Sequence, residues 1–177
     1  MEDISLHILD IAENSVTAGS TLIKIRVRHD RAEDSLTVEI EDNGKGMSKE
    51  TVEKVLDPFF TSRTTRKVGL GLSLLAQAAR DTGGDISIQS EEGAGTAVRV
   101  RFRPSHVDMK PVGNLADTIL VLIAANPGID FIFIYGDRYS LDTREIKTEL
   151  DGVPINAPAV IAALREDLNT YRSNQET

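Results

Sequence analysis

The polar residues at 42–47 have the types and spacing of a site for a flat ring that carries an amino group. The stretch 41–50 reads EDNGKGMSKE and follows a run of alternating apolar residues. Asp42 supplies an acceptor at the end of the predicted strand, and Met47 offers a soft apolar surface beyond the turn. Gly44 and Gly46 let another group approach the backbone closely. An Asx turn is the competing interpretation of Asp42.

A second stretch, at 57–73, could lie against phosphate. It reads DPFFTSRTTRKVGLGLS, and its basic residues are Arg63, Arg66 and Lys67. These positive charges, in a chain of net charge −8, predict a neighbouring polyphosphate, and a solvated basic loop is the alternative. Gly69 and Gly71 would let the backbone amides that open the next helix face the phosphates. The chain contains neither a P-loop nor a dinucleotide fingerprint, so the predicted phosphate site is of another kind.

Apolar periodicity predicts the elements that position these residues. Helical spacing runs from Ile4 to Val16, and alternation predicts antiparallel strands over 21–30 and 35–42. Ser48 is a suitable N-cap for the next helix. The remaining predicted elements are helices over 49–56, 72–80, 114–125, from 143 and over 158–171, and strands over 85–90, 96–104, 129–135 and 139–142. The strand FIFIY is apolar on both faces, so we expect it to be covered and not a free edge.

Composition excludes several classes of function. The chain has 177 residues, 40% of them hydrophobic, which is enough for one substantial core and a small appendage. A net charge of −8 and a pI of about 4.9 argue against a surface for nucleic acid or for an anionic membrane. Without cysteine there is no disulfide, thiolate zinc site or cysteine nucleophile. The acidic, amphipathic start MEDISLHILDIAENS is unlike a signal peptide, so we expect a cytoplasmic protein.

Four separated stretches together resemble the GHKL ATP-binding superfamily, which includes nucleotide domains of gyrase, heat-shock chaperones, mismatch-repair proteins and histidine kinases. In chain order they are LDIAENSVTAG, DNGKGM, DPFFTSR and GLGLSL. The resemblance covers residues 3–104. From Val68 onward the sequence is most similar to histidine kinases, whereas AENSVTAGSTLIKI is more similar to mismatch-repair and gyrase types. The resemblance implies that the ligand is ATP or ADP together with Mg²⁺.

The resemblance also implies a role for each matching residue. Asn14, on the inner face of the first helix, would offer a neutral carbonyl oxygen to Mg²⁺, which prefers oxygen ligands. A helix C-cap near Gly19 is the alternative for Asn14. Asp42 would accept from the adenine amino group, and Thr96 would support the adenine directly or through water. The predicted nucleotide-binding residues are Asn14, Asp42, Gly44, Gly46, Met47, Phe60, Arg63, Lys67, Gly69, Leu70, Gly71, Leu72 and Thr96, with Phe59 and Phe60 anchoring a lid over 61–72.

The sequence departs from the catalytic members of the superfamily in two respects. Asp10 lies one helical turn before Asn14, where hydrolytic and serine-kinase members carry glutamate as general base. Its side chain is one methylene shorter, so we predict that Asp10 is the base of a slow reaction, with a role in the Mg²⁺ site or as a backbone cap as the alternative. Glu13 points elsewhere around the helix and is predicted to be solvated. None of the three histidines has the helical-hairpin setting of a phospho-accepting histidine.

We predict a two-layer α/β sandwich of the Bergerat type, with helices on one face of a mixed, mostly antiparallel sheet. Residues 1–104 would form the ATP-binding domain, and residues 105–177 a C-terminal extension packed on it. The chain resembles small stand-alone members of the superfamily, which implies a regulatory kinase or slow ATPase acting with a partner protein. The alternative is a nucleotide-gated binding module with little catalysis, which an unused apolar face on the extension would favour. The sequence predicts neither the identity of the partner nor the oligomeric state.

Overall fold

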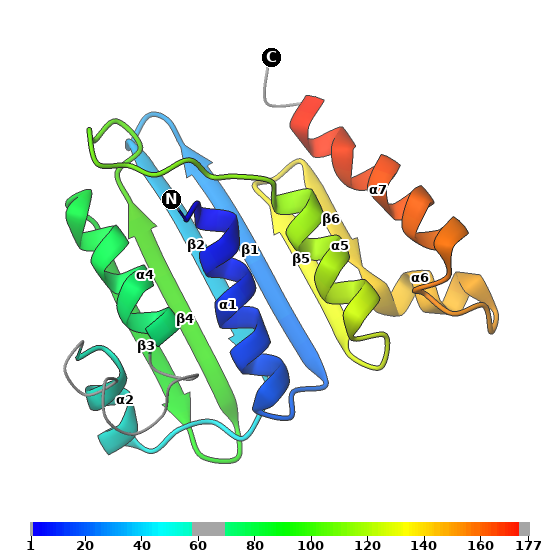
Figure 1. Cartoon of the computed structure of the whole chain (residues 1–177), viewed down its shortest axis with the longest axis horizontal. Coiled ribbons are helices and arrows are strands. Elements are labelled where there is room, and N and C mark those ends of the chain that lie inside the picture. Colours follow the sequence, from blue (N-terminus) through cyan, green and yellow to red (C-terminus); the bar gives the residue numbers. More distant parts are fainter. Residues whose placement is uncertain (1, 58–69, 174–177) are drawn as a thin grey trace.

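The computed structural model describes residues 2–57 and 70–173, which form one sheet with helices packed against it (Figure 1). The six strands lie in the order β3-β4-β2-β1-β5-β6. Their bounds are β1 Leu22–Asp30, β2 Ser35–Asp42, β3 Asp85–Glu91, β4 Gly95–Phe102, β5 Asp130–Tyr135 and β6 Tyr139–Asp142. All neighbouring strands are antiparallel except β1 and β5, which are parallel. The predicted mixed, mostly antiparallel α/β fold is confirmed.

Helices cover one face of this sheet, and Figure 1 shows α1, α4 and α5 lying across it. The described helices are α1 Ile4–Thr17, α2 Lys49–Val55, α4 Leu70–Asp81, α5 Leu115–Ala125, α6 Thr143–Leu150 and α7 Pro158–Ser173. Ser48 caps α2 as predicted, because its hydroxyl accepts from the Thr51 amide at 3.2 Å. Helix α4 begins two residues before and ends one residue after the helix predicted over 72–80. No helix within the described ranges is long and apolar enough to cross a membrane.

Alternation along the strands builds the core between the sheet and the helices. Ile23, Ile25 and Val27 of β1 are each at most 1% exposed. Lys24 and Arg26, which alternate with them, are only half-buried on the opposite face. The predicted division of this strand into an apolar and a wet face is confirmed. Its predicted antiparallel pairing holds for β2, but on its other side β1 runs parallel to β5.

The apolar strand β5 is internal, as its sequence predicts, because it pairs with β1 on one side and β6 on the other. Its burial is one-sided. Phe131 and Phe133 are at most 1% exposed, whereas Ile132 and Ile134 on the other face are half-buried. The difference follows from the layering, since helices cover a single face of the sheet.

The elements that follow β4 are tied to the first helix and to the sheet. The segment between β4 and α5 runs back past the start of α1, where the Ile4 amide donates to the Pro111 carbonyl at 2.9 Å and the Ser5 amide to the Val112 carbonyl at 2.8 Å. Amides in the first turn of a helix have no partner within the helix, so these bonds satisfy two of them. Tyr171 of α7 then packs its ring against that of Phe133, with the ring centroids 5.9 Å apart.

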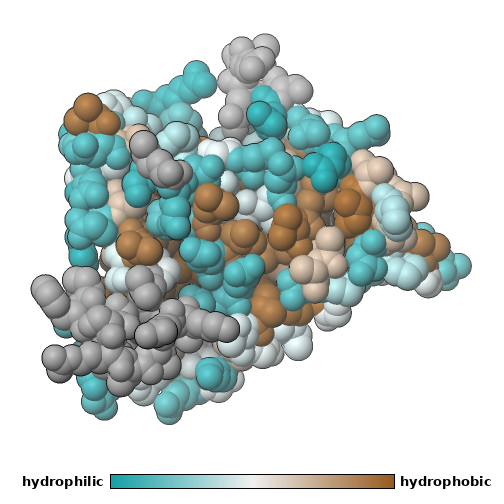
Figure 2. All heavy atoms as spheres, in the orientation of Figure 1, coloured by the Kyte–Doolittle hydropathy of each residue, from teal (hydrophilic) through white to brown (hydrophobic). Residues whose placement is uncertain are grey.

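Packing leaves some apolar side chains uncovered on the helical face. Figure 2 shows apolar residues among polar ones across the middle of this face. The exposed large apolar residues include Leu6 of α1, 43% exposed, and Val121 of α5, 50% exposed. Apart from Val121, the large apolar side chains of α5 are buried in the core.

Candidate functional site

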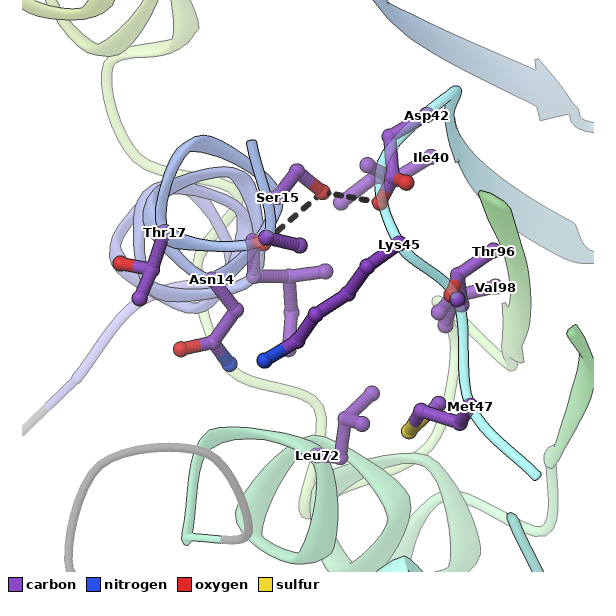
Figure 3. Close-up of a pocket in the computed structure, with 13 residues that line it drawn as sticks. Asn14, Ser15, Thr17, Ile40, Asp42, Lys45, Met47, Leu72, Thr96 and Val98 are labelled. Atoms are coloured by element: carbon purple, nitrogen blue, oxygen red, sulfur yellow. Dashed lines mark hydrogen bonds between the residues drawn. The ribbon is translucent and has the colours of Figure 1, made fainter. Parts of the chain in front are cut away.

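A pocket lies between α1, the loop that follows β2, the start of α4 and strand β4 (Figure 3). The cavity measures about 100 Å³. Whole ligand pockets usually measure roughly 300–1,000 Å³. The described walls therefore fit a ligand part of the size of a flat ring better than a complete nucleotide. Most of the lining is apolar, and its polar side chains come from α1, from the end of β2, from the loop that follows it and from β4.

The carboxylate of Asp42 is held in place at the end of β2 by two hydrogen bonds. Its Oδ2 accepts from the Ser15 hydroxyl at 2.6 Å, and its Oδ1 accepts from the Gly44 amide at 2.9 Å (Figure 3). A carboxylate can accept at about four lone-pair positions. Asp42 therefore keeps acceptor capacity for a further N–H group, as recognition of a ring amino group requires.

Ser15 is not among the predicted site residues, although the sequence carries a signal for it. Ile4, Ile8 and Ile11 form the buried stripe of α1, and Ser15 continues that stripe one turn later. A polar side chain in a buried stripe needs a hydrogen-bond partner, and Asp42 is that partner. Lys45 is a second residue that the sequence analysis does not single out. It is a charged residue between two glycines, and it also lines the pocket.

Two glycines shape the loop and the turn that packs on it. Gly46 has φ of +68°, and a Cβ there would lie 2.0 Å from the Glu91 carbonyl oxygen. Gly95 has φ of +117°, and a Cβ there would lie 2.0 Å from the Asp42 carbonyl oxygen. Both positions therefore need glycine because of close protein backbone. The predicted motif glycine Gly44 is likewise surrounded by protein, since a Cβ there would lie 2.7 Å from the Ser20 hydroxyl.

Asn14 and Asp10 lie one turn apart on α1 and both adjoin the start of α4. A Cβ on Gly71 would lie 3.7 Å from Asn14 Nδ2 and 3.6 Å from Asp10 Cβ. Asn14 lines the pocket, whereas Asp10 is not among the lining residues. Within the described ranges, the Asn14 side chain has no hydrogen-bond partner, so its carbonyl oxygen is available to a ligand. Glu13 is exposed, as predicted.

The electrostatic environment of Asp10 favours uptake of a proton. Burial raises the pKa of Asp10, the nearby Glu2 raises it further, and His7 acts in the opposite direction. Burial has the opposite effect on the basic side chain of His7, whose pKa it lowers. The two ring nitrogens of His7 have no hydrogen-bond partner among the described residues. A carboxylate with a raised pKa is a stronger base, which is the property that a general base requires.

Of the other predicted site residues, Thr96, Met47 and Leu72 line the pocket. Thr96 pairs with Asp42 across β2 and β4, and its hydroxyl shares a 2.8 Å hydrogen bond with that of Ser90. Met47 and Leu72 lie on the side of the pocket opposite Ser15 (Figure 3). Leu70 is the first residue of α4. Phe59, Phe60, Arg63, Arg66, Lys67 and Gly69 lie outside the described residues, so their roles stay predictions.

Comparisons with known proteins match the segment that carries this pocket. The family model described as histidine kinase-, DNA gyrase B- and HSP90-like ATPase matches residues 2–106. The chain is 38% identical over 78 residues to the sensor kinase CckA of Brucella abortus, a match that covers 44% of this chain and 8% of CckA. It is 38% identical over 89 residues to the histidine-protein kinase AtoS of Escherichia coli, covering 50% of this chain and 14% of AtoS. The chain thus spans a small part of these relatives.

Solved structures show the same fold. The ATPase domain of Aquifex aeolicus MutL, solved with ADP, matches with a TM-score of 0.56 at 19% identity, over 80% of this chain and 63% of that one. The N-terminal domain of a DNA repair protein matches with a TM-score of 0.55 at 16% identity, over 80% of this chain and 52% of that one.

Proposed function

Because the chain belongs to the family of histidine kinase-, DNA gyrase B- and HSP90-like ATPases, we propose that its pocket binds ATP or ADP together with Mg²⁺. The observation that carries this proposal is the Asp42 carboxylate, held by Ser15 and Gly44 with acceptor capacity left over. The related fold of the MutL ATPase domain, which was solved with ADP, supports an adenine nucleotide as the ligand.

The residues around the pocket match the parts of such a ligand. Asp42 would accept from the adenine amino group, while Met47 and Leu72 would contact the ring. Asn14 lies toward the start of α4, where the first backbone amides of the helix favour an anion such as phosphate. Its free carbonyl oxygen suits Mg²⁺, which is usually held by few protein oxygens together with phosphate oxygens. Bound Mg²⁺ would neutralise negative charge on the phosphates.

We propose that the chemical role is that of a regulatory kinase or slow ATPase. Asp10 would accept the proton of the attacking water or side-chain hydroxyl group. The oxygen of that attacking group would bond to the γ-phosphorus, while the bond between the γ-phosphorus and the β–γ bridging oxygen breaks. The products would be ADP and phosphate from water, or ADP and a phosphorylated protein from a side-chain hydroxyl. Incubation with γ-labelled ATP, with and without cell lysate, distinguishes these outcomes by showing whether label enters phosphate, this chain or another protein.

A nucleotide-gated binding module is the second candidate function. The observation that favours it is that residue 10 is an aspartate, one methylene shorter than the glutamate that catalytic members of the superfamily carry there. In this case ATP would change the surface offered to a partner protein, the chain alone would release no labelled phosphate, and its addition to lysate would increase neither labelled phosphate nor labelled protein above lysate alone.

Selective binding of adenine nucleotides tests the proposed ligand. We expect Mg-ATP and Mg-ADP to bind, and Mg-GTP to bind roughly 5- to 150-fold more weakly, because guanine presents a carbonyl oxygen where adenine presents an amino group to Asp42. An unpaired buried acceptor costs about 1–3 kcal/mol. Isothermal titration calorimetry measures the affinities. Equal affinity for ATP and GTP would contradict the role of Asp42, and no binding of either would contradict the proposed function.

Replacement of Asn14 by alanine tests the metal site. We expect Asn14→Ala to weaken ATP binding roughly tenfold, about 1.4 kcal/mol, in the presence of Mg²⁺ and to have little effect in EDTA. The reason is that the lost carbonyl oxygen would contact the ion and not the phosphates. Glu13→Ala, at the exposed neighbouring position, is the matched control and should leave both affinities unchanged. An equal loss with and without Mg²⁺ would remove Asn14 from the metal role.

A further inference from the structure

We infer that Lys45 is a phosphate-binding residue of this pocket, an inference that rests on the proposed nucleotide site. The backbone of Lys45 is fixed on both sides. Its amide donates to the Ala18 carbonyl at 2.9 Å, and its carbonyl accepts from the Gly93 amide at 2.7 Å. The side chain therefore starts from a point held by the end of α1 and by the turn between β3 and β4.

The direction of the side chain places its charge at one end of the pocket. In Figure 3 the stem of Lys45 crosses the pocket from the loop, and its amino group ends beside the Asn14 amide, away from Asp42. Among the described lining residues, Lys45 is the one cation and Asp42 the one anion. The pocket thus has an acceptor end at Asp42, which corresponds to the amino group of adenine, and a cationic end beside Asn14, toward which the phosphates of a nucleotide would extend out of this ring-sized cavity.

The charge of Lys45 is not used elsewhere in the described part of the chain. Lys54 and Lys147 form ion pairs with Glu50 and Asp130, whereas no ion pair of Lys45 occurs within residues 2–57 and 70–173. An ammonium group offers three donors and no acceptor, so its natural partners here are phosphate oxygens. The flexible four-carbon stem lets the amino group follow the ligand, while the fixed backbone keeps it within reach of the pocket.

Comparison of ADP with adenosine isolates this contact. We expect Lys45→Met, which keeps most of the stem and removes the charge, to weaken ADP binding about tenfold and to leave adenosine binding unchanged. Lys45→Arg should retain most of the ADP affinity, because it keeps the charge. Lys49→Met is the matched control, since Lys49 is an exposed lysine at the start of α2 that does not line the pocket. Calorimetry measures ADP, and NMR titration of the full chain measures adenosine.

Measurements with and without Mg²⁺ distinguish the role of Lys45 from that of Asn14. A direct contact between ammonium and phosphate should give the same loss for Lys45→Met in Mg²⁺ and in EDTA, unlike the Mg²⁺-dependent loss expected for Asn14→Ala. Unchanged ADP affinity of Lys45→Met, or equal losses for ADP and adenosine, would overturn the role of Lys45 alone. Failure of the wild-type chain to bind either ligand would overturn the proposed nucleotide site as well.

Discussion

Asp10→Asn is expected to slow ATP turnover about 10²- to 10⁴-fold while leaving ATP affinity unchanged. Asparagine has nearly the same shape as aspartate but cannot take a proton from the attacking group. Affinity should survive because Asp10 lies beside the pocket and does not line it. The measurement is steady-state phosphate release at saturating Mg-ATP. Glu13→Gln, an exposed acid on the same helix, is the control and should leave the rate unchanged.

The pH dependence of the same reaction checks the assignment independently. Burial raises the pKa of Asp10, so the base should be lost by protonation at a higher pH than for an ordinary aspartate, whose pKa is about 3.9. The value of kcat/KM should therefore fall as the pH decreases through the raised pKa of Asp10, which lies above that of an ordinary aspartate, because kcat/KM reports the ionisation of groups in the free enzyme.

Asp10→Glu, with one more methylene of reach, should increase turnover. Identical rates for wild type, Asp10→Asn and Asp10→Glu would exclude Asp10 and favour the nucleotide-gated binding module.

Asp42→Asn is expected to weaken ATP binding roughly 5- to 150-fold, and Asp42 is thus the binding residue with the largest expected effect. The carboxylate accepts from Ser15 Oγ and from the Gly44 amide, each through a different oxygen. An asparagine amide keeps one acceptor oxygen and turns a donor toward one of these groups or toward the adenine amino group. One of the three hydrogen bonds to residue 42 is therefore lost, because the asparagine NH2 group then faces another donor instead of accepting from it.

A matched control separates this effect from a general change in charge. Glu41→Gln removes the same charge at the neighbouring, exposed position of β2 and should leave ATP affinity unchanged. Calorimetry gives the affinities, and thermal unfolding establishes that the Asp42→Asn chain is folded. Wild-type affinity in a folded Asp42→Asn chain would show that the adenine amino group is recognised elsewhere.

The sequence predicts the elements well because burial in this fold is one-sided. In β2 the residues Leu36, Val38 and Ile40 are buried in strict alternation, and the predicted bounds 35–42 agree with the observed strand. The sequence does not predict which strands that lie far apart in the chain pair with each other across the sheet. The apolar run of β5 predicts a covered strand but neither which of its faces is buried nor that β5 runs parallel to β1, because no local pattern encodes a remote partner. The predicted boundary at residue 104 stays a prediction, although β5 and β6 extend the same sheet.

The sequence predicts the motif residues of the candidate site but not the contacts that join them. Asp42 and Thr96 belong to separate stretches, and the register between β2 and β4 places them opposite each other. The bond from Ser15 to Asp42 needs the packing of α1 against the sheet, which sequence periodicity places only approximately. Phe60 and Arg63 lie outside the described residues, so the predicted lid stays a prediction.

The parallel pairing of β1 with β5 has a consequence for biosynthesis. Leu22 pairs with Asp130 and Val27 with Tyr135, so the partner of this edge of β1 leaves the ribosome after the strands β1 to β4. A nascent chain emerges from its N-terminus, and until β5 follows, β1 is an outer strand with unpaired backbone groups beside strongly apolar side chains. Such an edge can pair with other chains. Emergence of β5 from the ribosome is therefore the step at which this edge of β1 gains its partner and is closed to other chains.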